Sequence, residues 1–210
     1  MRRFSFFLAV LVVFLLGAWG AKGSTIQWSV ADGGNGHYYE FVNTKPDGTR
    51  FLWPDAKLAA ESMTYLGITG HLVTIASAEE NNFVFQNVLD PGARTIGAWI
   101  GLTDDEAFGG HESFGQPNPR VDGWVWVTGE SINFTGWSNG EPNNADGHED
   151  YGLMHAYTGT LAWNDQSDYY TAHIIVEFDA VPEPSTFALL GVGTVCLLVY
   201  AGRKRFRSAG

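Results

Sequence analysis

Residues 140–165 read GEPNNADGHEDYGLMHAYTGTLAWND, and this stretch decides how the rest of the chain is interpreted. It contains three groups of oxygen-bearing side chains: Glu141-Pro142-Asn143-Asn144, Glu149-Asp150 and Trp163-Asn164-Asp165. Ca²⁺ prefers roughly six to eight oxygen ligands from carboxylates, amides and backbone carbonyls. An amide that ligates through its oxygen can still donate through its NH₂, and a ligating carboxylate can still accept. The stretch therefore predicts a site that holds Ca²⁺ together with two hydroxyl groups of a ligand.

The two ends of the chain indicate export. Residues 1–23 contain Arg2 and Arg3, then an apolar run and a group of small residues, which is the pattern of a secretory signal peptide. A second apolar run covers residues 187–202 and leads into a basic cluster that should stay cytoplasmic. That run is short for a membrane span, which needs roughly 17 to 25 residues. An ordinary tail anchor would have the same composition. We expect one exported domain, residues 24–180, with a membrane segment behind it.

The composition of residues 24–180 narrows the possible partners. This part of the chain has five Lys or Arg residues against 22 Asp or Glu residues. Nucleic acid is not expected as a partner, because phosphate recognition needs a basic surface. The length fits one domain with a sizeable core. The single cysteine, Cys196, lies in the C-terminal segment, so the domain is expected to fold without a disulfide.

The first half of the domain is predicted to hold one strand and two helices. Residues 37–42 alternate and are rich in strand-forming side chains. A helix should begin at Trp53-Pro54 and continue to Leu66, with Gly67 just past its end, because apolar residues recur there at helical spacing. Ser77 followed by Glu80 has the form of a capping box, which predicts the start of the second helix.

The second half is predicted to consist of short strands and one long loop. Strands are expected at residues 99–102, 123–127 and 174–178, between turn-forming residues. Residues 135–161 show little periodicity and contain most of the oxygen ligands. An ordered loop of that length is uncommon without a function. The pattern predicts an α+β domain whose ligand site lies in this loop.

The C-terminal segment carries a recognisable motif. Residues 181–186, VPEPST, stand before the apolar run and the basic end, and together they resemble the PEP-CTERM sorting signal of exported bacterial proteins. Pro182, Glu183 and Pro184 form the motif itself. The resemblance implies a transient membrane anchor that an exosortase cleaves. It also implies a mature protein in the cell envelope or extracellular matrix, with an exopolysaccharide as an expected partner.

The order of motifs in residues 36–179 resembles the C-type lectin-like domain. The matching segments include residues 70–75 (GHLVTI), 99–102 (WIGL), 137–144 (WSNGEPNN) and 163–165 (WND). The resemblance implies a double-looped α+β fold, in which two helices flank short antiparallel sheets and the first and last strands pair. Ala60 with Val176, and Tyr151 with Asp168, occupy the positions of the family's two usual disulfides. We expect a core contact for the first pair and a hydroxyl–carboxylate hydrogen bond for the second.

Carried over position by position, the resemblance implies a principal Ca²⁺ site. Its ligands would be Glu141, Asn143, Glu149, Asn164 and Asp165, with a cis peptide bond before Pro142. All of these except Asp165 would also hydrogen-bond to a bound sugar. In the family, Glu-Pro-Asn accompanies mannose-type ligands and Gln-Pro-Asp accompanies galactose. Gln116-Pro117-Asn118 is similar but lies in an apparent insertion with no partner ligands nearby.

An auxiliary Ca²⁺ site is also implied by the resemblance. Its ligands would be Asp104, Asp122, Asn144, Glu149 and Asp150. An insertion at about residues 108–120 displaces one acidic position of the family pattern, and Asp122 is expected to replace it. Without the resemblance, Asp104, Asp105 and Glu106 would be interpreted as a solvated acidic turn.

The sequence as a whole predicts Ca²⁺-dependent binding of mannose-type glycans by an exported protein. The alternative is a structural or adhesive module of the same fold that binds protein without using sugar. Glu141 and Glu149 could be the paired carboxylates of a glycosidase. However, ligation of a cation would remove the free acid, so no enzyme activity is expected. A zinc site is not expected either, because no ligand spacing is shared by His71, His148, His155 and His173.

Overall fold

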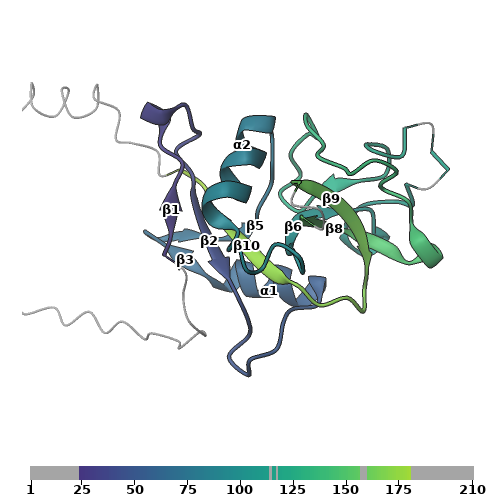
Figure 1. Ribbon diagram of the computed structural model, residues 1–210, viewed down its shortest axis with the longest axis horizontal. Helices are drawn as coiled ribbons and strands as arrows, with labels where there is room; N and C mark the ends of the chain where they lie inside the picture. Colours follow the sequence, from purple (N-terminus) through teal and green to yellow (C-terminus); the bar gives the residue numbers. More distant parts are fainter. Residues whose placement is uncertain (1–23, 114, 117, 157–159, 181–210) are drawn as a thin grey trace, which may run out of the picture.

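The computed structural model describes residues 24–113, 115–116, 118–156 and 160–180, and Figure 1 shows them as one α+β domain. The main sheet has the strand order β1 (Ile26–Gln27), β2 (Tyr38–Val42), β10 (His173–Phe178), β6 (Ala98–Thr103), β8 (Glu149–His155) and β9 (Ala162–Ser167). Two short strands extend it, since β5 (His71–Leu72) pairs with β10 and β7 (Val125–Trp126) pairs with β6. The predicted α+β architecture is confirmed.

The predicted signal peptide and C-terminal membrane segment lie outside the described residues. Within the described residues, no helix is both long enough and apolar enough to cross a membrane.

The first and last long strands of the domain pair with each other. β2 and β10 run antiparallel, from Ile174 opposite Val42 to Phe178 opposite Tyr38. β10 also pairs in parallel with β6 through His173 and Ile174. The last strand therefore lies at the centre of the sheet and joins the N-terminal part of the chain to the part that carries the oxygen ligands.

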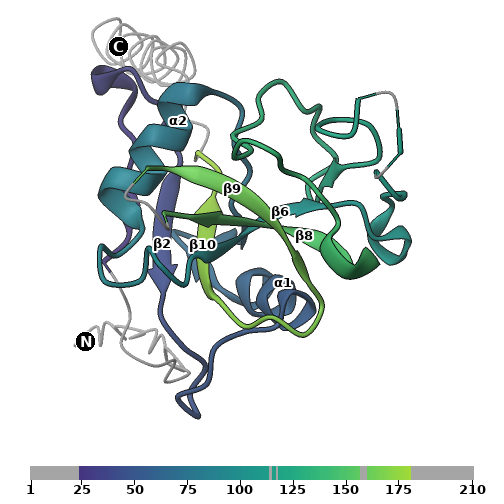
Figure 2. The same cartoon turned by 45° about the vertical axis from the view of Figure 1, so that its right-hand side comes forward.

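Helices cover both faces of this central strand, as Figures 1 and 2 show. α1 (Trp53–Ser62) packs in a cluster with Ile174 and Val176. α2 (Ala78–Phe83) continues into a π-helical turn, Val84–Val88, which packs with Ile175. Successive side chains of a strand point to opposite faces. A helix covers each face of β10, and all six residues of the strand are therefore buried.

The first helix ends earlier than the sequence predicts. α1 stops at Ser62, and the chain then forms a small hairpin of β3 (Thr64–Tyr65) and β4 (Ile68–Thr69). The turn between them consists of Leu66 and Gly67, both with positive φ. Positive φ in two central residues suits the twist of a two-residue hairpin loop. The helical spacing of Met63 and Leu66 was therefore misleading, because this turn and its flanking β-formers determine the local structure.

The second helix begins where the capping pair predicts. The Ser77 hydroxyl oxygen accepts a hydrogen bond from the Glu80 N–H at 3.1 Å. The Glu80 carboxylate accepts from the Ala76 N–H at 2.7 Å and from the Tyr39 hydroxyl at 2.6 Å. This buried carboxylate therefore attaches the start of the helix to strand β2.

The prediction of one long loop at residues 135–161 is wrong. β8 begins at Glu149, inside that stretch, and pairs with β9 over most of its length. β8 is almost continuously buried, so its sequence lacks the alternation of a strand with one solvated face. β9 does alternate in burial, but Asn164, Asp165 and Gln166 are polar and conceal the pattern.

Candidate functional site

Strands β8 and β9 carry three of the five predicted principal ligands. Glu149 is the first residue of β8, and Asn164 and Asp165 lie in the middle of β9. In the antiparallel register, Leu153 is opposite Asn164 and Gly152 is opposite Asp165. These ligands are therefore held by paired strands, and the loop that precedes β8 supplies only Glu141 and Asn143.

Trp163 fixes the position of that loop against β9. The indole is fully buried, and its Nε1–H donates to the side-chain oxygen of Asn81 at 2.9 Å. The Trp163 N–H donates to the Gly136 carbonyl at 2.8 Å, and the Trp163 carbonyl accepts from the Ser138 N–H at 2.9 Å. The segment leading to Glu141 therefore runs beside Asn164 and Asp165.

Asp165 connects the loop and the strand through its carboxylate. The side chain is fully buried, and one oxygen accepts hydrogen bonds from the Asn143 N–H at 2.9 Å and the Asn144 N–H at 2.7 Å. The peptide bond between Glu141 and Pro142 is cis. Glu141, Asn143 and Asp165, which lie on both sides of β8 in the sequence, are thus brought together.

One oxygen of the Glu141 carboxylate has no hydrogen bond within the described part of the chain. Its Oε2 atom is buried and has no hydrogen-bond partner among the described residues. Burial and then the neighbouring Asp165 carboxylate raise the pKa of Glu141, and burial also raises the pKa of Asp165. Two adjacent carboxylates, one with an unpaired buried oxygen, favour a bound proton or a bound cation.

Asn164 and Glu149 complete the predicted set. The Asn164 Nδ2 donates to the Asp165 carbonyl at 2.6 Å. If the amide were turned by 180°, its oxygen would face that carbonyl, an arrangement that needs a cation between the two oxygens. Glu149 Oε2 accepts from the Ala145 N–H at 2.8 Å, while the Glu149 N–H donates to the Asn144 side-chain oxygen at 3.0 Å. The donor set is oxygen-rich and acidic, which fits Ca²⁺.

A second acidic group lies around Asp104. Asp104 Oδ2 accepts from the Ser113 N–H at 3.0 Å, whereas Oδ1 is buried and unpaired among the described residues. Burial, with smaller contributions from the carboxylates of Asp150 and Glu112, raises the pKa of Asp104 to about 7. Glu112 also accepts from the side-chain amide of Asn144 at 2.9 Å. The acidic neighbours of Asp104 are therefore Asp150 and Glu112.

Asp122, which the sequence suggested for this group, has a different contact. Its Oδ2 accepts from the Asn118 N–H at 2.9 Å and closes a local turn. The His111 N–H donates to the Gly123 carbonyl at 3.0 Å, so the chain leaves the domain after residue 111 and rejoins it at residue 123, next to its point of departure. We call the segment between these two residues the excursion. Glu112 stands at the start of this excursion. Sequence reasoning missed Glu112 because this residue falls inside the insertion assigned to about residues 108–120. The backbone pairing is the signal that locates it.

The two residue pairs expected at the disulfide positions of the family make different contacts. Ala60 and Val176 are both fully buried in the cluster beneath α1. The Tyr151 hydroxyl donates to Asp105 at 2.6 Å, so the hydrogen bond expected with Asp168 is wrong. The Tyr151 ring also stacks on Trp53, with 4.8 Å between the ring centroids. The tyrosine thus joins α1 to the acidic turn after β6.

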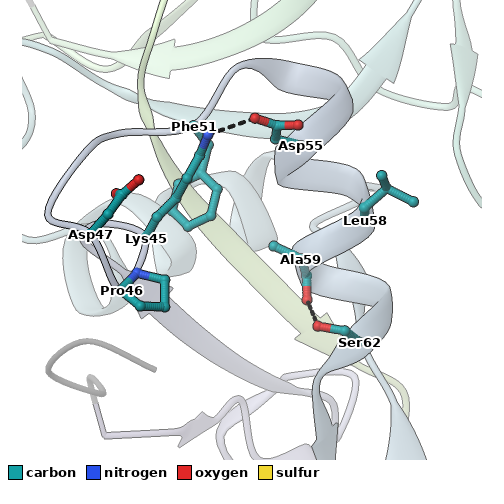
Figure 3. Close-up of a pocket in the computed structure, with 8 residues that line it drawn as sticks. All are labelled: Lys45, Pro46, Asp47, Phe51, Asp55, Leu58, Ala59 and Ser62. Carbon is teal, nitrogen blue, oxygen red and sulfur yellow. Dashed lines mark hydrogen bonds and ion pairs between the residues drawn. The ribbon is translucent and has the colours of Figure 1, made fainter. Parts of the chain in front are cut away.

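One cavity of about 590 Å³ lies away from these residues, between α1 and the preceding loop (Figure 3). Phe51, Leu58 and Ala59 form its apolar lining, and Lys45 bonds to Asp55 at its rim, with 2.6 Å between Nζ and Oδ2. None of the predicted ligand residues lines it. The candidate site is therefore the polar group on β8, β9 and the loop before β8.

Comparison with protein families gives two matches. The Lectin C-type domain matches residues 67–178, and the PEP-CTERM protein-sorting motif matches residues 180–205. The first match lies within residues 24–180, and the second lies in the C-terminal segment.

Individual proteins show the same likeness. The chain is 28% identical over 169 residues to the Alpha-N-acetylgalactosamine-specific lectin of Patiria pectinifera, covering 77% of this chain and 89% of that protein. It is 32% identical over 136 residues to Halomucin of Haloquadratum walsbyi, covering 64% of this chain but 1% of Halomucin. Among solved structures, the C-type lectin CEL-I from Cucumaria echinata has a TM-score of 0.52 at 28% identity, covering 69% of this chain and 91% of that one.

Proposed function

This chain belongs to the C-type lectin domain family, and from that premise we propose that its domain binds carbohydrate through a Ca²⁺ ion. The ion would be held by Glu141, Asn143, Glu149, Asn164 and Asp165. Mannose-type glycans are the proposed ligand class. Weak binding of one sugar unit would be compensated by several copies of the protein or by a repeating glycan.

The observation that carries the proposal is the carboxylate pair of Glu141 and Asp165. Glu141 has a buried oxygen without a partner among the described residues, next to a fully buried aspartate. A buried carboxylate oxygen without a hydrogen bond costs free energy, because its desolvation is not offset. A divalent cation would offset the charge of both carboxylates at once, and it would use the unpaired oxygen as a ligand.

Some residues of the site would bind only the ion, and others would bind both the ion and the sugar. Asp165 is fully buried and bonded to two backbone N–H groups, so its role would be to position the loop and ligate the ion. Asn143 is exposed and Glu141 and Asn164 are partly exposed, so they can reach a sugar as well as the ion. Two vicinal sugar hydroxyls would complete the coordination, since Ca²⁺ accepts oxygen ligands of several kinds.

The choice of sugar rests on Glu141 and Asn143. The Glu-Pro-Asn triplet supports a mannose-type ligand, whereas the relative in Patiria pectinifera is named for N-acetylgalactosamine. Both sugars therefore belong in the test. The PEP-CTERM motif implies export and a C-terminal membrane anchor. We propose that an exosortase processes the chain and that an extracellular polysaccharide is its partner.

The experiment is retention of the full chain on immobilised mannose, galactose and N-acetylgalactosamine, with Ca²⁺ and then with a chelator. We expect retention on mannose that chelator abolishes. The double variant Glu141→Gln with Asn143→Asp should shift retention towards galactose. Asn118→Asp is the matched control, because it makes the same amide-to-carboxylate change at an exposed asparagine outside the site, and it should retain the wild-type preference.

Three results would count against the proposal. Retention that is insensitive to chelator would exclude a role for Ca²⁺. Absence of retention on any sugar or polysaccharide would favour the protein-binding alternative. If the double variant and the wild type had the same sugar preference, direct recognition by Glu141 and Asn143 would be wrong.

A further inference from the structure

A separate cluster of imidazole and carboxylate groups lies at the other side of the sheet. His37 immediately precedes β2, His71 begins β5, Glu177 is in β10 and Asp179 follows β10. Glu177 is opposite His71 in the register, and the neighbouring Phe178 is opposite Tyr38. The cluster therefore surrounds the C-terminal end of β10, whereas the proposed carbohydrate site lies on β8, β9 and the loop before β8. The cluster shares no residue with the proposed carbohydrate site.

The distances between its polar atoms suit a small coordination sphere. His37 Nδ1 is 2.6 Å from Glu177 Oε1 and 3.9 Å from Asp179 Oδ1. One ligand atom from each of His37, Glu177 and Asp179 lies within 4.8 Å of the other two. A tetrahedral zinc ion with ligands at about 2.0 to 2.1 Å separates them by about 3.3 Å. The observed separations bracket this value, and Asp179, which is exposed, has room to adjust.

His71 contacts Asp179 and the backbone of β5. Its Nδ1 lies 2.8 Å from the Leu72 carbonyl oxygen. Its other ring nitrogen, Nε2, is 3.3 Å from Asp179 Oδ1. Because both ring nitrogens have a contact, the imidazole is held where it can position the Asp179 carboxylate.

Glu177 is held in the orientation that a metal ligand needs. Its side chain is 1% exposed. Oε2 accepts from the Thr74 N–H at 2.9 Å and from the Thr74 hydroxyl at 3.1 Å, which leaves Oε1 directed to His37. Metal-ligating carboxylates are commonly held in this way by hydrogen bonds to the oxygen that does not ligate. His37, Thr74 and Glu177 also line a cavity of about 320 Å³ through which an ion could enter.

We propose that His37, Glu177 and Asp179 bind a transition-metal ion, with Zn²⁺ as the favoured species and His71 positioning Asp179. Imidazole is a good ligand for zinc, whereas Ca²⁺ takes oxygen ligands. Two carboxylates balance the two charges of the ion, so the buried Glu177 would be neutralised. A fourth position stays open for water or for a ligand atom.

The ion would connect two distant parts of the chain. His37 and Glu177 are separated by 140 positions in the sequence. Asp179 directly precedes the PEP-CTERM match at residues 180–205. Bound zinc would therefore attach the end of the lectin domain, at the start of the sorting motif, to the segment before β2.

The test is zinc binding to the full chain, purified without a histidine tag and saturated with Ca²⁺ so that the acidic site is filled. Equilibrium dialysis with metal analysis should find one equivalent of Zn²⁺. His37→Gln and Asp179→Asn should each weaken binding by about tenfold or more, and His71→Gln by about 10- to 100-fold through loss of the positioning contact. His111→Gln removes an exposed histidine elsewhere and should bind zinc as the wild type does.

Fluorescence spectra of the tryptophans would show whether each variant is folded. Asp179→Asn is the decisive variant, because Asp179 is exposed and its replacement should not disturb the core. Absence of zinc binding in the presence of Ca²⁺ would overturn the proposal, and so would equal affinities for wild type and Asp179→Asn. Sugar retention is not part of the readout, so this proposal and the proposed function fail independently.

Discussion

Replacement of Asp165 by asparagine should separate the stability of the metal-free domain from its response to Ca²⁺. The Asp165 carboxylate is fully buried beside Glu141 and accepts from the N–H groups of Asn143 and Asn144. In Asp165→Asn, the remaining oxygen can keep both of these bonds. The new NH₂ can donate to Glu141, and a hydrogen bond to a charged group contributes about 1.5 to 3 kcal/mol.

Without Ca²⁺, the unfolding free energy of the variant should therefore equal that of the wild type or exceed it by up to about 2 kcal/mol, since repulsion between two carboxylates is removed. With Ca²⁺ the order should reverse. Extracellular Ca²⁺ modules have dissociation constants of roughly 10⁻⁴ to 10⁻³ M. At roughly 10 mM Ca²⁺ such a site stabilises the folded state by about 1.4 to 2.7 kcal/mol. The wild type should gain this amount, and the variant should gain almost none.

Urea unfolding of the full chain at neutral pH, followed by tryptophan fluorescence, measures both quantities. Asp32→Asn is the control, because Asp32 is exposed in a short turn far along the sequence from the site, and it should gain as much from Ca²⁺ as the wild type does. A variant Asp165→Asn that is less stable than the wild type without Ca²⁺, and that still gains stability with Ca²⁺, would refute the reasoning.

Three further predictions follow from individual side chains. The folded-state pKa of Asp104 is about 7, against an ordinary value of 3.8. The unfolding free energy of the Ca²⁺-free protein should therefore fall by up to about 4 kcal/mol as the pH rises from 3.8 to 7. Urea unfolding at a series of pH values measures this fall, and Asp104→Asn should abolish it. Calorimetric Ca²⁺ titration should show weaker binding at the second site in Glu112→Gln, by about tenfold or 1.4 kcal/mol, with no change in Asp122→Asn; the opposite result would restore Asp122 as the ligand. Leu153→Ala, at a fully buried position of β8, should lower the unfolding free energy by about 2 to 5 kcal/mol in urea. A loss below about 1 kcal/mol would show that the sheet centre repacks.

Local sequence signals were reliable where neighbouring residues alone determine the structure. Ser77 and Glu80 predicted the start of α2, because a cap depends on groups three positions apart. The same kind of signal failed at Met63 and Leu66, where helical spacing competed with a hairpin turn. It also failed for β8, because a strand buried on both faces has no alternating pattern.

The candidate site, too, could be predicted from the sequence only in part. Residue types and their order were enough to select the oxygen donors around residues 140–165, since the preference of Ca²⁺ for oxygen depends on side-chain chemistry alone. Their arrangement depends on the pairing of β8 with β9 and on Trp163, which holds the preceding loop. Glu112 lies in the second acidic group because residues 111 and 123 pair and close the excursion between them, which the sequence does not show.

By itself, the sequence determined the chemistry of the donors, the acidic character of the domain, its lack of cysteine and the sorting motif behind it. Tertiary structure alone decided which donors meet. His37 lies beside Glu177, and Asn143 beside Asp165, because strands pair across long separations in the chain. Hydrophobic burial on both faces of β10 drives that pairing, and the polar residues that form the sites contribute little to it.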